Sequence, residues 1–200
     1  MSKTIQYFFA PQSPYVYLGH ERLLKLGAQY GAMIEPKPFD LGAVFAESGG
    51  LPLAKRAPQR QAYRLQELER WSRHLGLRMN LQPKFFPVDQ MPASLLLIAA
   101  REQGGADQAL ELTTAITRAV WAEEKNIADP ATLEQLAGDA GFDGAALLAA
   151  SRRPETQRKY EGFTKEALDA GVFGAPWYVV DAQGFWGQDR LDFVERLLQV

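Results

Sequence analysis

The stretch FFAPQSPYVYL, residues 8–18, decides the fold that this sequence predicts. Its apolar run stops at Ala10-Pro11, and an apolar-periodic segment begins directly after Ser13-Pro14. Serine is a preferred residue at the N-cap of a helix, and proline is favoured at the first helical position. The stretch therefore predicts a strand that passes through a tight loop into a helix beginning at Pro14.

Thiol–disulfide enzymes carry a reactive Cys-x-x-Cys pair at this kind of junction, because a helix N-terminus stabilises a thiolate. Here the four residues are Ser13-Pro14-Tyr15-Val16, and the chain contains no cysteine. Disulfides, iron–sulfur clusters and thiolate zinc sites are thereby excluded. Ser13 is either a simple N-cap or, together with free helix N–H groups, a binding site for a thiolate brought by a cofactor. We expect that cofactor to be glutathione, the obvious cellular thiol.

The composition is that of an ordinary soluble globular protein. The 200 residues are 46% hydrophobic and 23% charged, with a formal net charge of −2 and no long charged run. Nothing in this pattern favours nucleic acid or a membrane surface as a partner. With only His20 and His74, far apart, we expect no metal site. The short N-terminal apolar stretch does not fit a signal peptide, so a cytoplasmic protein is expected.

The rest of the chain divides into two ends with strand composition and a helical middle. The strand candidates are residues 3–9, 33–39, 177–181 and 185–186. A helix over 14–30 joins the first pair, and prolines in the second strand place it at a sheet edge. A turn at 182–184 joins the second pair, before a final helix capped by Asp189.

Residues 41–171 carry helical spacing and no strand pattern. The helical segments are residues 58–75, 92–103, 106–124, 130–140, 143–151 and 154–170. The order βαβ, helices, ββα predicts an α/β thioredoxin-like fold with a large helical insertion. We expect residues 1–40 and 172–200 to form the thioredoxin-like domain and residues 41–171 to form an inserted helical domain.

The tripeptide Gly174-Ala175-Pro176 directly precedes the third strand. Proline is tolerated at the first position of a strand, which is one interpretation. In a thioredoxin-like arrangement, however, Pro176 follows a cis peptide bond and faces the N-terminus of the first helix. The backbone of Ala175 can then pair with a peptide-like ligand.

A second candidate site surrounds Gln188-Asp189, before the last helix. These residues either cap that helix or bind an α-amino-acid head, with the Asp189 carboxylate on the ammonium and Gln188 on the carboxylate. Lys55, Arg56 and Arg60 are either a solvated basic face or the source of a contact to the other carboxylate of glutathione.

The sequence resembles the 2-hydroxychromene-2-carboxylate isomerases, relatives of the kappa-class glutathione transferases and of the Cys-Pro-x-Cys disulfide oxidoreductases. The resemblance covers essentially the whole chain. Its most specific pieces are SPYVYL (13–18), FFPVD (85–89), RAVWAEEKNIADP (118–130), GVFGAP (171–176) and FWGQDRLDFV (185–194).

The resemblance implies a role for each matching residue. Ser13 matches the active-site serine and is expected to stabilise the glutathione thiolate. Ala175, before cis-Pro176, is expected to bond glutathione through its backbone. Gln188 and Asp189 match the residues that bind the γ-glutamyl group.

Arg60 matches a basic position that is often lysine in the family, followed three residues later by Tyr63. Arginine keeps the positive charge there but differs from lysine in how it binds a carboxylate. The sequence departs from the family at residues 10–12, which lack the usual Asp-Phe, and at Asp89, where many relatives have Asn. Both departures concern substrate specificity.

The implied reaction converts 2-hydroxychromene-2-carboxylate into trans-o-hydroxybenzylidenepyruvate, a step of aromatic hydrocarbon catabolism. A thiolate adds to the conjugated double bond, the resulting single bond rotates, and elimination returns the double bond as trans. The resemblance also implies a homodimer. Aromatic residues are expected to bind the small aromatic acid, with Phe9, Tyr15, Phe86 and Trp186 as the candidates.

Two alternatives stay open at this stage. One is a kappa-like glutathione transferase or peroxidase acting on other electrophiles, whose site would be nearly identical. The other is a non-catalytic thioredoxin-like binding module, which would bind no thiol. The pair Gln188-Asp189, together with Ala175-Pro176, argues against the binding module.

Overall fold

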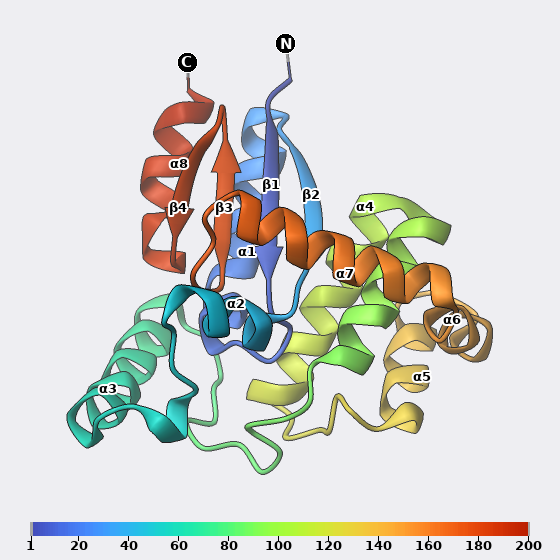
Figure 1. Ribbon diagram of the computed structural model, residues 1–200, viewed down its shortest axis with the longest axis horizontal. Helices are drawn as coiled ribbons and strands as arrows, with labels where there is room; N and C mark the ends of the chain where they lie inside the picture. Colours follow the sequence, from blue (N-terminus) through green and yellow to red (C-terminus); the bar gives the residue numbers. More distant parts are fainter. Residues whose placement is uncertain (1, 200) are drawn as a thin grey trace.

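A four-stranded mixed sheet forms the centre of the computed structural model, which describes residues 2–199 (Figure 1). Strand β1 pairs in parallel with β2 and antiparallel with β3, and β3 pairs antiparallel with β4. The strands are β1 (Thr4–Phe9), β2 (Met33–Pro38), β3 (Trp177–Val180) and β4 (Gln183–Trp186). The order β2-β1-β3-β4 confirms the predicted thioredoxin-like topology and the edge position of β2.

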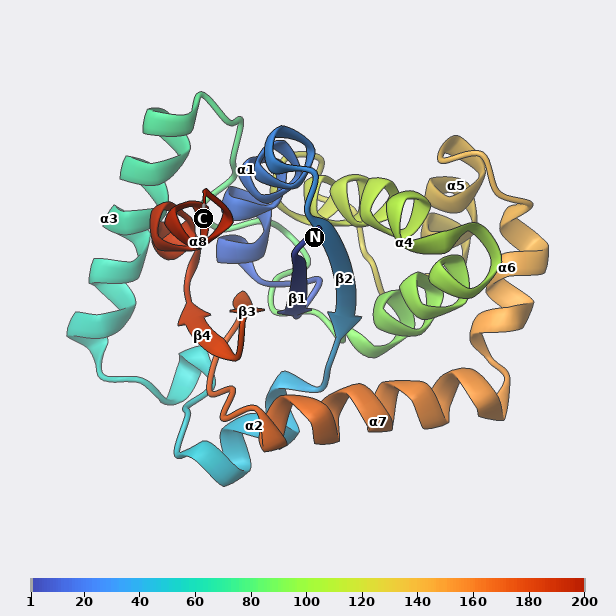
Figure 2. The ribbon, with the colours of Figure 1, turned by 90° about the horizontal axis from the view of Figure 1, so that it is seen from above.

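Helices cover both faces of this sheet (Figure 2). One face carries α1 and α8, and the opposite face carries α2 and α7. The helices are α1 (Pro14–Tyr30), α2 (Leu41–Ser48), α3 (Pro58–Leu75), α4 (Met91–Trp121), α5 (Pro130–Asp139), α6 (Gly144–Ser151), α7 (Pro154–Asp169) and α8 (Leu191–Leu198), with 3-10 turns η1 (Leu53–Lys55) and η2 (Gln188–Arg190).

The composition of β1 explains why both faces need a cover. Ile5, Tyr7 and Phe9 belong to the main core on the α1 side, whereas Phe8 packs against Phe39 on the other side. Strands buried on both faces have continuous apolar runs of this kind. The run YFF therefore requires helices on each side of the sheet.

The middle helices share the main core instead of forming a separate one. The apolar cluster that contains Tyr7 of β1 continues through Ile116 of α4 into Leu133 of α5 and Leu147 of α6. Helix α7 returns from this group to lie across the sheet beside α2 (Figures 1 and 2). The proposed boundaries at residues 40 and 172 stay a prediction.

Two local features differ from the predictions. Helix α2 was not expected; its N-cap, Asp40, accepts hydrogen bonds from the backbone N–H groups of Gly42 and Ala43. The β3–β4 turn lies at Asp181-Ala182, not at 182–184, and both residues have positive φ (48° and 63°). Such two-residue turns match the twist of the strands that they join.

A buried histidine connects α1 to β1 and α4. The His20 side chain is 1% exposed, with Nδ1 3.2 Å from the Tyr7 hydroxyl and Nε2 2.9 Å from the Leu110 carbonyl oxygen. A carbonyl oxygen only accepts, so Nε2 carries the proton and Nδ1 accepts from Tyr7. Burial lowers the pKa of His20 to about 4, although the Leu110 carbonyl opposes that shift.

This histidine predicts a loss of stability in acid. Because the pKa of His20 is lower in the folded chain than its ordinary 6.5, the unfolded chain takes up the proton first as pH falls. The free energy of unfolding should therefore drop by about 2–3 kcal/mol between pH 7.5 and 4.5 through this group alone. Urea unfolding at the two pH values measures this loss.

In His20→Gln the loss should shrink by that amount, whereas His74→Gln, at an exposed position, should keep the full loss. An unchanged pH dependence in His20→Gln would contradict the assignment.

Candidate functional site

Ser13 lies where β1 turns into α1, as predicted. Its backbone is extended (φ −71°, ψ 129°), Pro14 is the first helical residue, and the Tyr17 N–H donates to the Ser13 carbonyl oxygen at 3.2 Å. Its hydroxyl, however, does not cap the helix; it donates to the carbonyl oxygen of Ala175 at 3.4 Å. The hydroxyl is thus directed across the loop, and the first N–H groups of α1 have no side-chain cap.

The segment that faces Ser13 has the predicted geometry. The Ala175–Pro176 peptide bond is cis, and the Gly187 N–H donates to the Pro176 carbonyl oxygen at 2.9 Å. This bond ties the start of η2 to the start of β3. Ser13, the Ala175-Pro176 segment and η2 consequently lie together at one end of the sheet.

The two residues of η2 singled out by the sequence have different environments. Gln188 is 1% exposed, and its Oε1 accepts a hydrogen bond from Nη1 of Arg22 at 3.1 Å. Asp189 is exposed, with Oδ2 2.8 Å from Nη1 of Arg190. The prediction that Asp189 caps the last helix is wrong: Gly187 (φ 101°) leads into a 3-10 turn, and α8 begins only after it.

Of the three basic candidates, Arg56 has an electrostatic link to the start of α1. Its charge opposes the burial that raises the pKa of the neighbouring Tyr15. Nε of Arg56 also donates to the Leu51 carbonyl oxygen at 2.8 Å. Arg60 and Lys55 are exposed, and within residues 2–199 the Arg60 side chain makes neither a hydrogen bond nor an ion pair.

The four aromatic candidates do not converge on one place. Phe9 is fully buried and stacks on Tyr7 at a centroid distance of 4.6 Å, so it belongs to the core and not to a pocket wall. Trp186 is 53% exposed on β4, opposite Trp177 and against Phe173, on the sheet face away from α1. Tyr15 and Phe86 are both half-buried.

The chain has a buried cation near this site that the sequence did not indicate. Arg64 of α3 is 8% exposed, with its guanidinium carbon 5.1 Å from the centroid of the Phe86 ring and 5.7 Å from that of Trp121. Burial lowers its pKa, and the nearby Tyr15 hydroxyl opposes that shift.

The signal for Arg64 was present in the helical spacing of α3. The residues that α3 buries are Arg64, Leu68 and Ser72, four residues apart, whereas Tyr63 is 57% exposed. Spacing of this kind places the three buried residues on one face of the helix, but the charge of an arginine by itself suggests the solvent side.

Trp121 connects this cation to the Ser13 loop. Its indole Nε1 donates to the carbonyl oxygen of Gln12 at 3.2 Å, and Phe86 packs on its ring at 4.8 Å. The side-chain oxygen of Gln12 in turn accepts from the Val88 N–H at 3.3 Å. Residues 86–88 are therefore held against the loop that carries Ser13.

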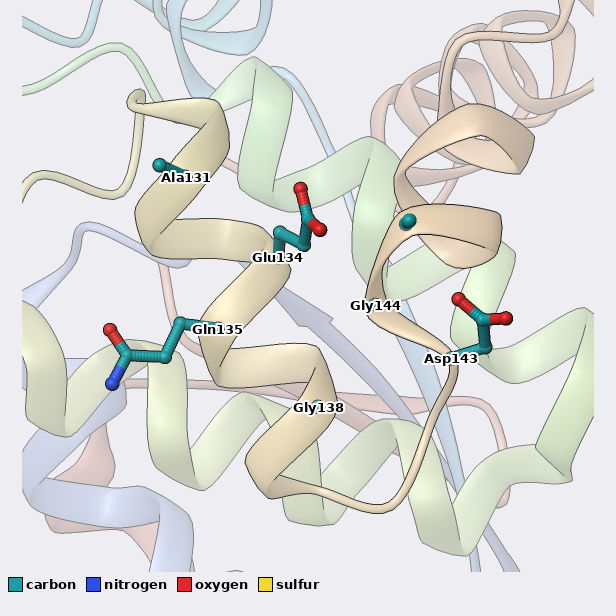
Figure 3. A pocket seen from close by; sticks show the side chains of 7 residues that line it. Ala131, Glu134, Gln135, Gly138, Asp143 and Gly144 are labelled. Carbon is teal, nitrogen blue, oxygen red and sulfur yellow. The ribbon is translucent and has the colours of Figure 1, made fainter.

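A surface hollow between α5 and α6 lies apart from these residues (Figure 3). Glu134 and Gln135 extend to different sides of α5, and Asp143 is the N-cap of α6, accepting from the Ala146 N–H at 3.0 Å. Within residues 2–199 no group of three or more His, Asp or Glu side chains could hold a metal ion. The hollow therefore adds nothing to the candidate site.

Comparisons with known proteins agree with this geometry. A family model described as the DsbA-like thioredoxin domain matches residues 4–199. A 2-hydroxychromene-2-carboxylate isomerase of Sphingobium xenophagum is 34% identical over 99% of each chain. Glutathione S-transferase kappa 1 of Caenorhabditis elegans is 28% identical over 98% of this chain and 90% of its own. A solved 2-hydroxychromene-2-carboxylate isomerase superposes with a TM-score of 0.83 at 24% identity, covering 98% of this chain and 94% of its own.

The close packing of α1 on η2 predicts the effect of one glycine substitution. A Cβ at Gly19 would lie 2.7 Å from Cβ of Gln188 and 3.1 Å from the Tyr178 hydroxyl. Gly19→Ala should therefore lower the free energy of unfolding by about 1–3 kcal/mol, in spite of the better helix propensity of alanine. Gly138→Ala, with no atom within 4 Å of its Cβ, should raise it by about 0.5–1 kcal/mol. Equal stabilities of the two variants in urea would contradict the packing argument.

Proposed function

The chain belongs to the DsbA-like thioredoxin family, in the group that contains the 2-hydroxychromene-2-carboxylate isomerases and kappa-class glutathione transferases, and we propose that it is a glutathione-dependent isomerase of a small aromatic acid. One observation carries this proposal. A serine hydroxyl stands where thiol–disulfide enzymes place cysteine, beside an uncapped helix start and opposite the segment before a cis-proline.

The relatives are isomerases and glutathione transferases, so this chain is an enzyme of the same general kind. The specific reaction that we propose is the interconversion of 2-hydroxychromene-2-carboxylate and trans-o-hydroxybenzylidenepyruvate. We propose that it acts in the cytoplasm as a homodimer, within aromatic hydrocarbon catabolism. None of the helices in residues 2–199 has the length and apolar character needed to span a bilayer.

The residues at the end of the sheet fit a bound thiol. The first N–H groups of α1 lack a side-chain acceptor, and they favour a negative charge through the helix dipole. The Ser13 hydroxyl, now weakly bonded to Ala175, can turn its proton to a sulfur atom. When bound, glutathione supplies a thiolate that adds to the conjugated double bond and leaves again after rotation about that bond.

The peptide part of glutathione has its own candidate contacts. The Ala175 carbonyl oxygen, before Pro176, accepts only the long bond from Ser13, so this backbone can pair with the cysteinyl backbone. Asp189 presents an accessible carboxylate for the γ-glutamyl ammonium, and Gln188, held by Arg22, keeps η2 in position. Its amide nitrogen donates to no group within residues 2–199 and is available to the glutamyl carboxylate.

A basic side chain of residues 55–60 would bind the glycyl carboxylate. Arg60 matches the family position, whereas Arg56 is the one of these basic residues whose charge acts on Tyr15, where it adds to the larger effect of Arg64 in opposing the rise in pKa caused by burial. Among the aromatic candidates, Tyr15 is two residues after Ser13 in sequence. Phe86 is connected to the Ser13 loop through Trp121, which donates to Gln12. We keep Trp186 as a candidate only for the outer rim of the substrate site. Phe9 is in the core, where it can pack beneath the site but does not line it.

Thiol dependence tests the proposed function. Isomerisation of the chromene, followed by absorbance, should stop after dialysis against thiol-free buffer and return with glutathione far below the substrate concentration. S-methylglutathione should compete, because it keeps the peptide contacts but has no thiol to ionise. Full activity without any thiol would contradict the mechanism.

The same assay separates the isomerase from a kappa-like transferase, which the kappa relatives support as the second candidate. An isomerase returns glutathione after each turnover, whereas a transferase consumes one glutathione for each molecule of product. Loss of free thiol in proportion to product would favour the transferase.

Ser13→Ala should affect turnover far more than stability. Its hydroxyl makes one long hydrogen bond and no cap, so the free energy of unfolding should fall by less than about 1 kcal/mol. Turnover should fall about 10²-fold, the usual result of losing one preorganised donor. Thiolate absorbance should also show bound glutathione ionising at higher pH than in the unsubstituted enzyme.

Asp143→Ala is the matched control, because Asp143 does cap a helix far from the site. It should lose about 1 kcal/mol of stability and keep its turnover. Near-normal turnover in Ser13→Ala would reduce Ser13 to a packing role.

A further inference from the structure

The two buried cations within residues 2–199 differ in their hydrogen-bond and ion-pair partners. Lys37 and Arg64 are each 8% exposed. Nζ of Lys37 lies 2.7 Å from a carboxylate oxygen of Glu166 and 3.0 Å from the side-chain oxygen of Gln6. Arg64 forms no ion pair with any residue in 2–199, and its Nη2 is buried without a hydrogen-bond partner. A buried charge without a partner is costly, so the Arg64 arrangement calls for an anion that the chain itself does not provide.

The surroundings of Arg64 stabilise its charge without using its donors. The rings of Phe86 and Trp121 lie 5.1 Å and 5.7 Å from the guanidinium carbon, within the range of a cation–π interaction. Aromatic faces accept no strong hydrogen bond, so the planar fork of N–H groups stays available. That fork matches the two oxygens of a carboxylate.

Arg64 is also next to the proposed reaction centre. Trp121, on which it lies, donates to the carbonyl oxygen of Gln12, the residue before Ser13. Tyr15, two residues after Ser13, is close enough for the Arg64 charge to act on it. The cation therefore lies on the α3 and α4 side of the loop that carries the serine.

We propose that Arg64 is the residue that binds the carboxylate of the substrate, and that the site thereby selects anionic aromatic electrophiles. This inference rests on the proposed function and specifies its substrate class. The aromatic neighbours favour an aryl acid over the glycyl carboxylate of glutathione, because glutathione has no ring to place beside Phe86. The half-buried Arg56 and the exposed Arg60 suit the peptide carboxylate better.

Binding of a charged and an uncharged ligand of the same shape tests the inference. trans-Benzylidenepyruvate and its methyl ester are titrated by calorimetry into the full chain that has been saturated with S-methylglutathione. The unsubstituted protein should bind the acid more tightly than the ester. Arg64→Met should lose about 10- to 100-fold in affinity for the acid, the usual effect of removing a charge-assisted bidentate contact, and little for the ester.

Two further variants make the result specific. Arg73→Met removes an arginine from the exposed side of the same helix, where it pairs with Glu69 at 2.8 Å, and should change neither affinity. Arg64→Lys keeps the charge without the fork and should lie between the unsubstituted protein and Arg64→Met. It also serves as the test if Arg64→Met does not fold.

The outcomes separate this inference from the proposed function. Selective binding of the acid through Arg64, in a protein that isomerises no chromene, would support the inference and reject the reaction. Equal losses for acid and ester, an unchanged affinity for the acid, or no binding of the acid by the unsubstituted protein would overturn the inference. A selective loss of S-methylglutathione affinity in Arg64→Met would overturn it too, by assigning Arg64 to the cofactor.

Discussion

The antiparallel pairing of β1 with β3 brings together the two halves of the candidate site. Tyr7 faces Tyr178 and Phe8 faces Trp177, so two segments about 170 residues apart in sequence share one register. Because β1 ends at Phe9 and β3 begins at Trp177, the residues just beyond these ends must meet: Ser13 on one side and Ala175 on the other. A shift of this register by one residue would move every side chain of β3 to the other face and would separate the serine from the cis-proline segment. In the core, the Tyr7 ring stacks on the rings of Tyr178 and His20, and this packing stabilises the observed register.

Hydrogen-bond donors with few acceptors gather at this end of the sheet. The first N–H groups of α1 have no side-chain cap, the Ser13 hydroxyl has only a long bond to Ala175, and Nη2 of Arg64 has no hydrogen-bond partner. Lys37 and Arg22, by contrast, form ion pairs with Glu166 and Asp192. A folded chain leaves donors unpaired where something else completes them. A thiolate and a carboxylate are two anions of suitable size, and both belong to the proposed reaction.

Local signals predicted the fold well, since each acts over a few residues. Ser13-Pro14 correctly marked the start of α1, and Gly31, in the left-handed conformation, ends it. The order of elements then limited the topology to the one observed. The wrong predictions concern residues whose conformation depends on tertiary contacts. Asp189 has a good capping side chain, but the turn before α8 is set by the bond from Gly187 to Pro176, so its carboxylate points to Arg190 instead.

The candidate site was predicted less completely than the fold. The roles given to the residues that match family positions stay predictions. Of the aromatic candidates, Phe9 is in the core and Trp186 is on the far face, because the alternation along a strand does not reveal which face a ligand uses. Arg64 was missed for a similar reason. Helical spacing identifies the buried face of α3 only if Arg64 is recognised as a buried residue. Its charge alone suggests that it faces solvent.

On the proposed mechanism, a serine at the helix start in place of cysteine also changes how oxidation would affect the protein. A cysteine enzyme can lose its nucleophile to sulfinic or sulfonic acid, and the whole chain is then lost with it. Here the oxidisable sulfur would reside on a small molecule that exchanges with solution, and the chain itself contains no cysteine. On the proposed mechanism, a damaged nucleophile would be replaced by dissociation and exchange, without new protein synthesis. Activity would accordingly follow the reduced fraction of the cellular thiol pool, so the protein would slow under oxidative stress and recover as soon as that pool is reduced again.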